Sequence, residues 1–339
     1  MSVSKNSPKN PAFTQRIFIN AAYRSPIGKF GGALKKLSAA QLAANTLEQA
    51  IHKSKLSNPD YVIMGHARQA GAGPNTARQA CIYSGLSDSV PAWTINHACA
   101  SGMSALVHGV EKLLLSRAQN LWVGGVESMS NTPYLLPTAR WGQKLGNQKL
   151  QDAMYQDGFF CPMANMLMGE TVERFIATER NISRKEQDEW ALLSHKRATE
   201  SWSQQLFEEE VLPVQNKLAT LEKDEAYRPD SSIEALAKLP PVFDKEGTLS
   251  AGNSSAIVDG AAWLQISVDN KNAIAEILDY EVTALDPKLM GLGPVQSIRN
   301  LLERNNLNVN DIEAFEINEA FAAQMLACQK KSYKSLLKN

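Results

Sequence analysis

Short apolar runs and longer amphipathic stretches alternate along the first 126 residues of the chain. The apolar runs predict β-strands at 16–22, 61–64, 92–96 and 121–123. The stretches between them repeat apolar residues at helical spacing and predict helices after Ser38, from Asn75 to Tyr83, and from Cys99 through Leu114. Because strands alternate with helices, this part of the chain is expected to form an α/β layer with a mostly parallel sheet.

From about Glu127 to Asp244 this alternation gives way to turn residues and repeated prolines, which predicts an inserted loop domain. Its clearest helix is expected to begin at Ser183, which forms a capping-box pattern with Glu186. The α/β pattern returns around 258–268. We therefore predict a polar arm (1–15), a first α/β half (16–126 and 250–279), a loop domain (127–249) and a partial second half (280–339).

The segment from Glu281 onward weakly repeats the order of elements predicted for 16–66. A strand is predicted at 281–284, followed by a glycine-rich loop, a helix that carries Ile298, Leu301 and Leu302, and a strand at 314–317. The repetition indicates two similar halves. The first half delivers Cys99 after its third strand, whereas the second half is expected to be incomplete because the counterpart of that turn is missing.

Composition and charge exclude some classes of partner and location but leave the predicted fold unchanged. Thirty-five basic residues balance thirty-five acidic ones, so no overall field favours nucleic acid or an anionic membrane. No apolar run approaches the ~18 residues that a membrane-spanning helix needs, and the polar N-terminus lacks the hydrophobic core of a signal peptide. The expected location is the cytoplasm, with a short organelle-targeting arm as the alternative.

The four cysteines, Cys81, Cys99, Cys161 and Cys328, are scattered without a C-x-x-C pair. This spacing gives no hint of a zinc site or a disulfide framework, and no metal is expected. Cys99 stands between a predicted strand and the predicted start of a helix, where unpaired amides and the helix dipole favour a thiolate. The small residues 100–102 would let a substrate carbonyl approach the sulfur. From spacing alone, an activated nucleophile and an ordinary buried core thiol are about equally well supported.

Four segments, in order along the chain, resemble the motifs of the thiolase family. Residues 96–102 (NHACASG) are similar to its active-site cysteine signature, and 124–130 (GGVESMS) to the strand and loop that follow. Residues 247–255 (GTLSAGNSS) resemble its coenzyme A segment, and 318–324 (NEAFAAQ) its asparagine motif. The resemblance covers roughly residues 16–327 and implies a thiolase-like layered α-β-α-β-α fold of two similar halves, with an inserted loop domain and an incomplete second half.

The resemblance also implies roles for single residues. Cys99 would attack the acyl-CoA carbonyl and carry the acyl group, and Asn318 would hold a water in an oxyanion hole. Contacts with the substrate and coenzyme A would come from Leu167, Met168, Arg228, Phe243, Ala251, Ser255 and Phe321. Without the resemblance, Asn318 would be interpreted as a turn former and Arg228 as a solvated charge. Leu167 departs from the histidine found in some relatives, which leaves the chain-length preference open.

The implied reaction is acyl transfer: condensation of two acetyl-CoA molecules or thiolysis of a 3-oxoacyl-CoA, with coenzyme A as the substrate carrier and no cofactor. A 3-ketoacyl-CoA thiolase of fatty-acid β-oxidation and a truncated, non-catalytic acyl-CoA-binding chain are the alternatives. Family members carry a late Gly-His-Pro motif and a second catalytic cysteine, which this sequence lacks, so weak turnover is expected. His97 is the first candidate for a substitute base. The resemblance further implies a homo-oligomer, dimer or tetramer, that binds acyl-CoA. The balanced charge and the absence of a long apolar run predict no nucleic-acid or membrane partner.

Overall fold

A mixed β-sheet forms the centre of the molecule. The computed structural model describes residues 13–55, 58–142 and 145–336. Its large sheet has the strand order β13-β1-β12-β5-β3-β4, with β2 paired to the end of β12. The strands are β1 (Ile17–Arg24), β2 (Gly28–Lys29), β3 (Tyr61–Gly65), β4 (Ala92–Ile95), β5 (Asn120–Ser128), β12 (Val258–Ser267) and β13 (Ala275–Ile277). The strands predicted for 16–126 are therefore confirmed, and the region around 258–268, where the α/β pattern was expected to return, forms β12.

The direction of the strands differs in part from the predicted, mostly parallel sheet. β5, β3 and β4 pair in parallel, as expected for strands joined by helices. β12, however, lies antiparallel between β1 and β5; it pairs with β5 along nearly its whole length and with β1 from Ala262 to Ser267. Since β12 follows the long loop region, the local alternation of strands and helices carries no information on its direction.

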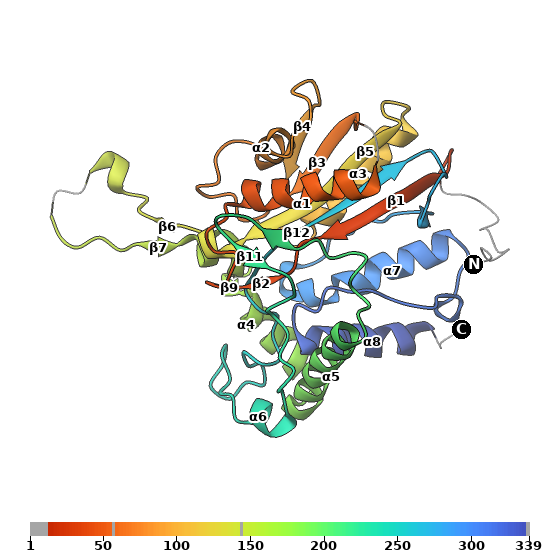
Figure 1. The fold of residues 1–339 in the computed structure, drawn as a ribbon. Helices are drawn as coiled ribbons and strands as arrows, with labels where there is room; N and C mark the ends of the chain where they lie inside the picture. The colour runs from red at the N-terminus through yellow and green to blue at the C-terminus, as the bar shows by residue number, and fades with distance from the viewer. Residues whose placement is uncertain (1–12, 56–57, 143–144, 337–339) are drawn as a thin grey trace.

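Helices cover both faces of this sheet (Figure 1). α1 (Ala39–Ser54) and α2 (Thr76–Tyr83) pack on one face, and α3 (Ser101–Leu114) packs on the other. Alternation along β5 explains the two cores, because successive side chains of a strand point to opposite faces. Trp122 belongs to the core under α1 and α2, whereas Leu121 and Val123 belong to the core under α3.

The region between β5 and β12 consists of short elements around one long helix, α5 (Arg184–Ser203). Ser183 caps α5, and Ser183 and Glu186 form the predicted capping box. The other elements are β6 (Tyr134–Leu135), β7 (Gln151–Asp152), β8 (Phe160–Cys161), β9 (Met166–Leu167), α4 (Met168–Val172), β10 (Val214–Gln215), β11 (Thr220–Leu221) and α6 (Ile233–Ala237), with single helical turns at Met129–Asn131, Ala139–Trp141, Tyr155–Phe159 and Glu173–Thr178. The chain around β6 and β7 extends from the body as an arm (Figure 1).

The last part of the described chain is helical rather than mixed. It contains a 3₁₀ segment at Pro287–Leu292, α7 (Gly293–Arg304), a turn at Val309–Asp311 and α8 (Ala322–Leu336). The helix predicted around Leu301 is confirmed as α7, but the strands predicted at 281–284 and 314–317 are wrong, because both segments lack regular structure. A strand forms only where another strand accepts its backbone hydrogen bonds, and no described strand pairs with either segment.

A third core joins the loop region to the end of the chain. Its fully buried members are Val172, Ile176, Leu249, Ala323 and Ala327, and the partly buried rings of Phe243 and Phe321 pack against them. This core holds residues 248–255 beside α8. No helix within the described ranges is both long and apolar enough to cross a membrane.

Candidate active site

Cys99 lies in a tight turn between the end of β4 and the start of α3. The residue before it, Ala98, adopts a left-handed backbone conformation with φ +48°, which L-residues rarely take and which reverses the chain here. Ser101 fixes the turn: its Oγ accepts from the His97 N–H at 2.9 Å and donates to the Ala98 carbonyl at 2.6 Å. The side chain of Asn96 accepts from the Ala98 N–H at 3.0 Å. The polar residues of the motif therefore hold the backbone of the turn.

Glycines bring the start of α3 close to the sheet. A Cβ on Gly65, the last residue of β3, would lie 2.2 Å from the backbone carbon of Ser101. Gly102 of α3 also lies against Gly125 of β5, since a Cβ on Gly125 would lie 3.4 Å from the Gly102 Cα. At Gly65 only a residue without a side chain permits this approach, whereas the distance between Gly102 and Gly125 is an ordinary van der Waals contact. Cys99 itself is exposed at the edge of the sheet.

The other cysteines have environments that suppress reactivity or limit access. Cys81 and Cys328 are buried, and burial raises the pKa of both thiols. Cys328 lies on α8, and its thiol donates to the Gly291 carbonyl at 3.2 Å. Cys161 is half-buried on β8, and its Sγ accepts from the Ala164 N–H at 3.4 Å. Exposure and a turn at the start of a helix coincide at Cys99.

The segments that contain Ser255 and Asn318 lie side by side. The Ser255 N–H donates to the Ala320 carbonyl at 2.9 Å, and the Ala322 N–H donates to the Asn253 carbonyl at 2.9 Å. Asn318, Ser255 and Ala251 are exposed. The structure thus brings together two of the sequence segments that were singled out, 247–255 and 318–324, although they are far apart in the chain.

Phenylalanine rings connect this pair of segments with the start of α4. Phe243 and Phe321 meet edge to face, with ring centroids 6.0 Å apart. The Phe243 ring also packs on Gly169, where an added Cβ would lie 2.2 Å from it. Met168, half-buried, is the neighbour of that glycine and the first residue of α4. Three of the expected contact residues, Met168, Phe243 and Phe321, therefore lie close together. A fourth, Ala251, lies in the adjacent turn 248–253.

Leu167 lines an open cavity of about 300 Å³ next to this region. The other lining residues are Gln151, Asp152, Tyr155, Gln156 and Phe160. Leu167 is held in β9 by pairing with Phe160, and its N–H donates to the Glu170 carboxylate at 2.6 Å. The cavity has apolar and polar walls. Leu167 lines it and also directly precedes the first residue of α4.

Arg228 lies beside α5, further along the helix, where His195 holds the Arg228 backbone. The Arg228 N–H donates to Nδ1 of His195 at 3.3 Å, and the Arg228 side chain is exposed. Burial lowers the pKa of His195, the Arg228 guanidinium lowers it further, and Glu319 and Asp230 act in the opposite direction. Because His195 accepts at Nδ1, the neutral imidazole is the form that fits this site.

The polar residues that hold these segments were not identified from the sequence. Asp188, Gln187, Ser194 and His195 on α5 contact three of the segments that contain candidate site residues. The sequence does show that these polar residues are spaced seven apart, which places them on the same face of the predicted helix. The contacts that order the Cys99 turn form a separate group from these.

An exposed cysteine at the start of a helix, on an α/β sheet and with small residues around it, is the arrangement of an enzyme that uses nucleophilic catalysis. Comparison with known sequences gives the family. Residues 17–268 match the thiolase N-terminal domain, and residues 271–336 match the thiolase C-terminal domain. The chain belongs to the thiolase family, and it is an acyltransferase.

The individual relatives agree with this assignment. The chain is 37% identical over 329 residues to a probable acetyl-CoA acyltransferase of Staphylococcus epidermidis, covering 93% of this chain and 83% of the relative. Among solved structures, the acetyl-CoA acetyltransferase of Bacillus anthracis has a TM-score of 0.90 and 38% identity, over 94% of this chain and 84% of that one. Human mitochondrial 3-ketoacyl-CoA thiolase in complex with CoA has a TM-score of 0.90 and 35% identity, over 94% and 83%. The thiolase-like fold is confirmed.

Proposed function

We propose that this chain transfers acyl groups from coenzyme A thioesters through a thioester on Cys99. The observation that carries the proposal is the placement of the exposed Cys99 thiol in a fixed turn at the start of α3. The sulfur attacks the carbonyl carbon of the acyl-CoA, the carbon–sulfur bond to coenzyme A breaks, and coenzyme A leaves as its thiol after taking up a proton. Backbone amides of the turn stabilise the oxyanion.

The acyl group then passes to a second acceptor. With acetyl-CoA as acceptor, its α-carbon gives up a proton and bonds to the acyl carbon as the bond to the Cys99 sulfur breaks, and the product is a 3-oxoacyl-CoA. In the reverse direction, thiolysis, the Cys99 sulfur attacks the 3-oxo carbon, the carbon–carbon bond breaks, acetyl-CoA leaves after taking up a proton, and coenzyme A then takes the acyl group from Cys99. Asn318 is proposed to hold a water that stabilises the thioester oxygen, since its segment is hydrogen-bonded to the Ser255 segment. Phe243, Ala251, Ser255, Met168 and Phe321 form the proposed coenzyme A side, with Arg228 on its nucleotide end. Coenzyme A serves as substrate carrier, and no prosthetic group is part of the proposal.

Two alternatives rest on specific observations. Similarity to human mitochondrial 3-ketoacyl-CoA thiolase supports a preference for longer 3-oxoacyl-CoA substrates, for which the cavity beside Leu167 offers a place. A chain that binds acyl-CoA without turnover is the second, since no general base beside Cys99 is assigned. Rates with acetoacetyl-CoA and with a long-chain 3-oxoacyl-CoA separate the first alternative from the main proposal.

We also propose that the chain forms a homo-oligomer. A cytoplasmic location stays a prediction, which cell fractionation would test.

Intact-mass measurement after incubation with acetyl-CoA tests the first step directly. The expected result is the addition of one acetyl group to the wild-type chain and none to Cys99→Ala. Cys161→Ser is the matched control, because Cys161 is the other thiol that is not fully buried. It should be acetylated like the wild type. An acetyl group that persists in Cys99→Ala contradicts the proposal, and acetylation without any condensation supports the non-catalytic alternative.

A further inference from the structure

Helix α5 has a polar face that contacts the proposed coenzyme A site at separate places. Asp188 and Gln187 lie one residue apart, and Ser194 and His195 follow seven residues later, so the four side chains share one face. Asp188 and Gln187 are buried, with exposed fractions of 1% and 0%. A charged carboxylate is rarely found at such a position unless it has partners that replace water.

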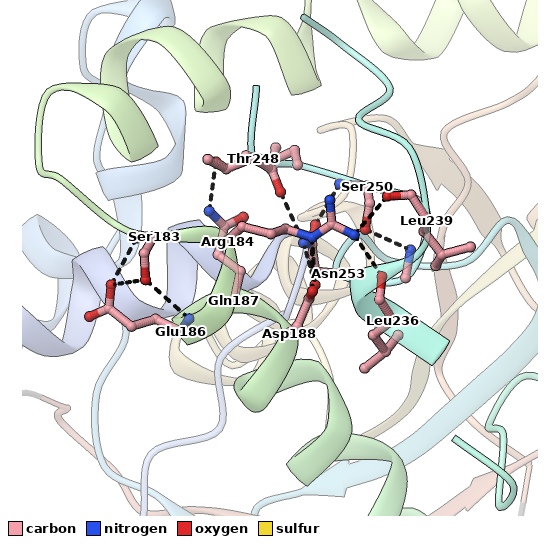
Figure 2. Close-up of polar contacts among 12 residues, drawn as sticks. Ser183, Arg184, Glu186, Gln187, Asp188, Leu236, Leu239, Thr248, Ser250 and Asn253 are labelled. Carbon is pink, nitrogen blue, oxygen red and sulfur yellow. Dashed lines mark hydrogen bonds and ion pairs between the residues drawn. The ribbon is translucent and has the colours of Figure 1, made fainter. Parts of the chain in front are cut away.

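The buried Asp188 carboxylate accepts hydrogen bonds from two side chains, the guanidinium of Arg184 and the amide of Asn253. Its carboxylate accepts from Nε of Arg184 at 3.0 and 2.8 Å and from Nδ2 of Asn253 at 2.9 Å (Figure 2). The Arg184 guanidinium also donates to the carbonyls of Leu236 and Leu239, at 2.7 and 2.9 Å. The Asp188 carboxylate is thus compensated in charge and hydrogen-bonded, and it fixes the side chain of Asn253.

Asn253 is hydrogen-bonded to both segments of the proposed coenzyme A side, 247–255 and 318–324. Its Oδ1 accepts from the Ser250 N–H at 2.8 Å, and its Nδ2 donates to the Thr248 carbonyl at 3.1 Å. Its own carbonyl accepts from the Ala322 N–H, at the start of α8. The amide side chain of Asn253, oriented by Asp188, therefore sets the turn 248–253, and the backbone carbonyl of the same residue binds Ala322, the residue next to Phe321.

A second buried carboxylate holds the beginning of the same turn. Glu173, 5% exposed, accepts from the Thr248 N–H at 2.8 Å, the Leu249 N–H at 2.7 Å and the Thr248 hydroxyl at 2.8 Å. Gln187 of α5 donates to the same hydroxyl at 2.8 Å (Figure 2). The turn is hydrogen-bonded from two sides, by the helical turn 173–178 and by α5.

The far end of the polar face reaches the other two segments. Ser194 donates to the Glu319 carboxylate at 2.7 Å, directly beside Asn318, and His195 accepts from the Arg228 N–H. We propose that α5 is the element that positions the coenzyme A site, with Asp188 as its principal positioning residue acting through Asn253. This inference rests on the proposed function for its ligand, but the positioning itself is a property of the chain.

Asp188→Asn tests the proposal with the least change in shape. It removes the charge that holds Arg184 and leaves the Asn253 amide facing a side chain that is part donor. Glu189→Gln is the matched control, since Glu189 is the adjacent residue on α5, 55% exposed, and pairs only with Lys185 at 3.8 Å in the described contacts. Calorimetric titration with coenzyme A is expected to show affinity about tenfold or more weaker in Asp188→Asn, as for loss of a hydrogen bond to a charged group. Glu189→Gln should bind like the wild type.

Two further readouts separate positioning from general damage. The rate of Cys99 alkylation should be unchanged in Asp188→Asn, because the contacts of the Cys99 turn do not involve α5. Amide hydrogen exchange at Ser250, Ser255 and Ala322 should speed up locally, while exchange in β5 and β12 stays slow. Unchanged exchange at these three amides overturns the inference, and so does an equal loss of protection across the whole sheet.

The exchange measurement also keeps this inference distinct from the proposed function. If the wild-type chain fails to bind coenzyme A but exchange changes locally in Asp188→Asn, the proposed function is wrong and the positioning role of α5 stands. If the wild type binds and Asp188→Asn binds equally well, the function stands and Asp188 is not a positioning residue.

Discussion

Single residues decide which of the four thiols reacts. Cys99 combines exposure with a backbone turn at a helix start, and burial raises the pKa of Cys81 and Cys328. Since the thiolate is the nucleophile, a raised pKa and poor access act in the same direction. The residue that discriminates between simple access and activation is Cys161, which is half-exposed and lies outside the turn.

The first prediction is that iodoacetamide at neutral pH modifies Cys99 before the other three cysteines. Cys161 should follow more slowly, and Cys81 and Cys328 should react last, as the buried thiols. Peptide mass spectrometry over a time course measures the four rates. If Cys99 and Cys161 react at the same rate, access alone governs the labelling, and Cys99 is not an activated thiol.

His195 gives the second prediction, which concerns pH. Its pKa is lowered from the ordinary value of 6.5, chiefly by burial. The unfolded chain therefore takes up this proton first on acidification, so this contribution to stability is complete above about pH 6.5 and is lost as the pH falls toward the folded value. Urea unfolding at several pH values should show a smaller loss of stability below this pH in His195→Asn, whose side chain retains an acceptor.

His52→Asn serves as the control for that measurement, because His52 is an exposed histidine of α1. Its stability curve should follow that of the wild type. A pH dependence that is the same in His195→Asn and the wild type would show that the imidazole of His195 is not held neutral by the fold.

At the scale of elements, the contact between β3 and α3 links the sheet to the reactive turn. Gly65 ends β3 where the backbone of Ser101 approaches it, and no side chain has room between them. The obstacle is backbone rather than the end of a flexible side chain, so an added methyl group has to move the start of α3. The turn that carries Cys99 moves with it.

The third prediction follows from this contact. Gly65→Ala should slow acetylation or alkylation of Cys99 by about tenfold or more, because a small misplacement of a reacting group can cost up to ~100-fold. Gly293→Ala is the matched control, since its added Cβ meets only an ordinary contact at 3.8 Å. Labelling kinetics on both variants check the prediction. A wild-type rate in Gly65→Ala would mean that the helix start adjusts without disturbing Cys99.

Elements also show where sequence patterns suffice and where they fail. α1, α5 and the strands of the first half follow from local periodicity and from the caps Ser38 and Ser183, which act within a few residues. The segments 281–284 and 314–317 have the composition of strands but pair with no described strand, so composition alone gave a wrong prediction. Strand pairing is a long-range property, as β12 between β1 and β5 also illustrates.

The candidate site divides in the same way. The Cys99 turn could be placed from local pattern because a strand, a small-residue turn and a helix adjoin in the sequence. For the Ser255 and Asn318 segments, the family resemblance implied only roles toward the same substrate, and their contact with each other was not predicted. The roles of Asp188 and Glu173 could not be anticipated, since a buried carboxylate and a solvated one look alike in a sequence.

At the scale of the whole molecule, neutral charge and exposed apolar side chains act together. The chain has equal numbers of acidic and basic residues and a pI near 7.0, so electrostatic repulsion between copies is weakest near neutral pH. Exposed apolar residues occur on the arm, such as Trp141 at 86%, and on the irregular segments near the end, at Val282 (55%) and Phe315 (43%). β4 is also an edge strand of the described sheet. Such features favour association.

The fourth prediction is therefore that the wild-type chain associates and that its stability depends on its own concentration. Val282 and Phe315 lie in the two segments that have strand-like composition but no strand partner, so contact with another copy would cover surface that the single chain leaves in water. The double variant Val282→Lys and Phe315→Lys should shift sedimentation velocity profiles toward the monomer, because a lysine placed in an apolar contact must lose its hydration. Trp141→Ser, on the arm, is the matched comparison and reports whether the arm contributes instead. Urea unfolding at several protein concentrations supplies the second measurement, since association with a folded partner raises the midpoint by mass action. A wild-type chain that sediments as a monomer and unfolds at one midpoint across all concentrations would contradict the prediction and show that these apolar segments are stable in water.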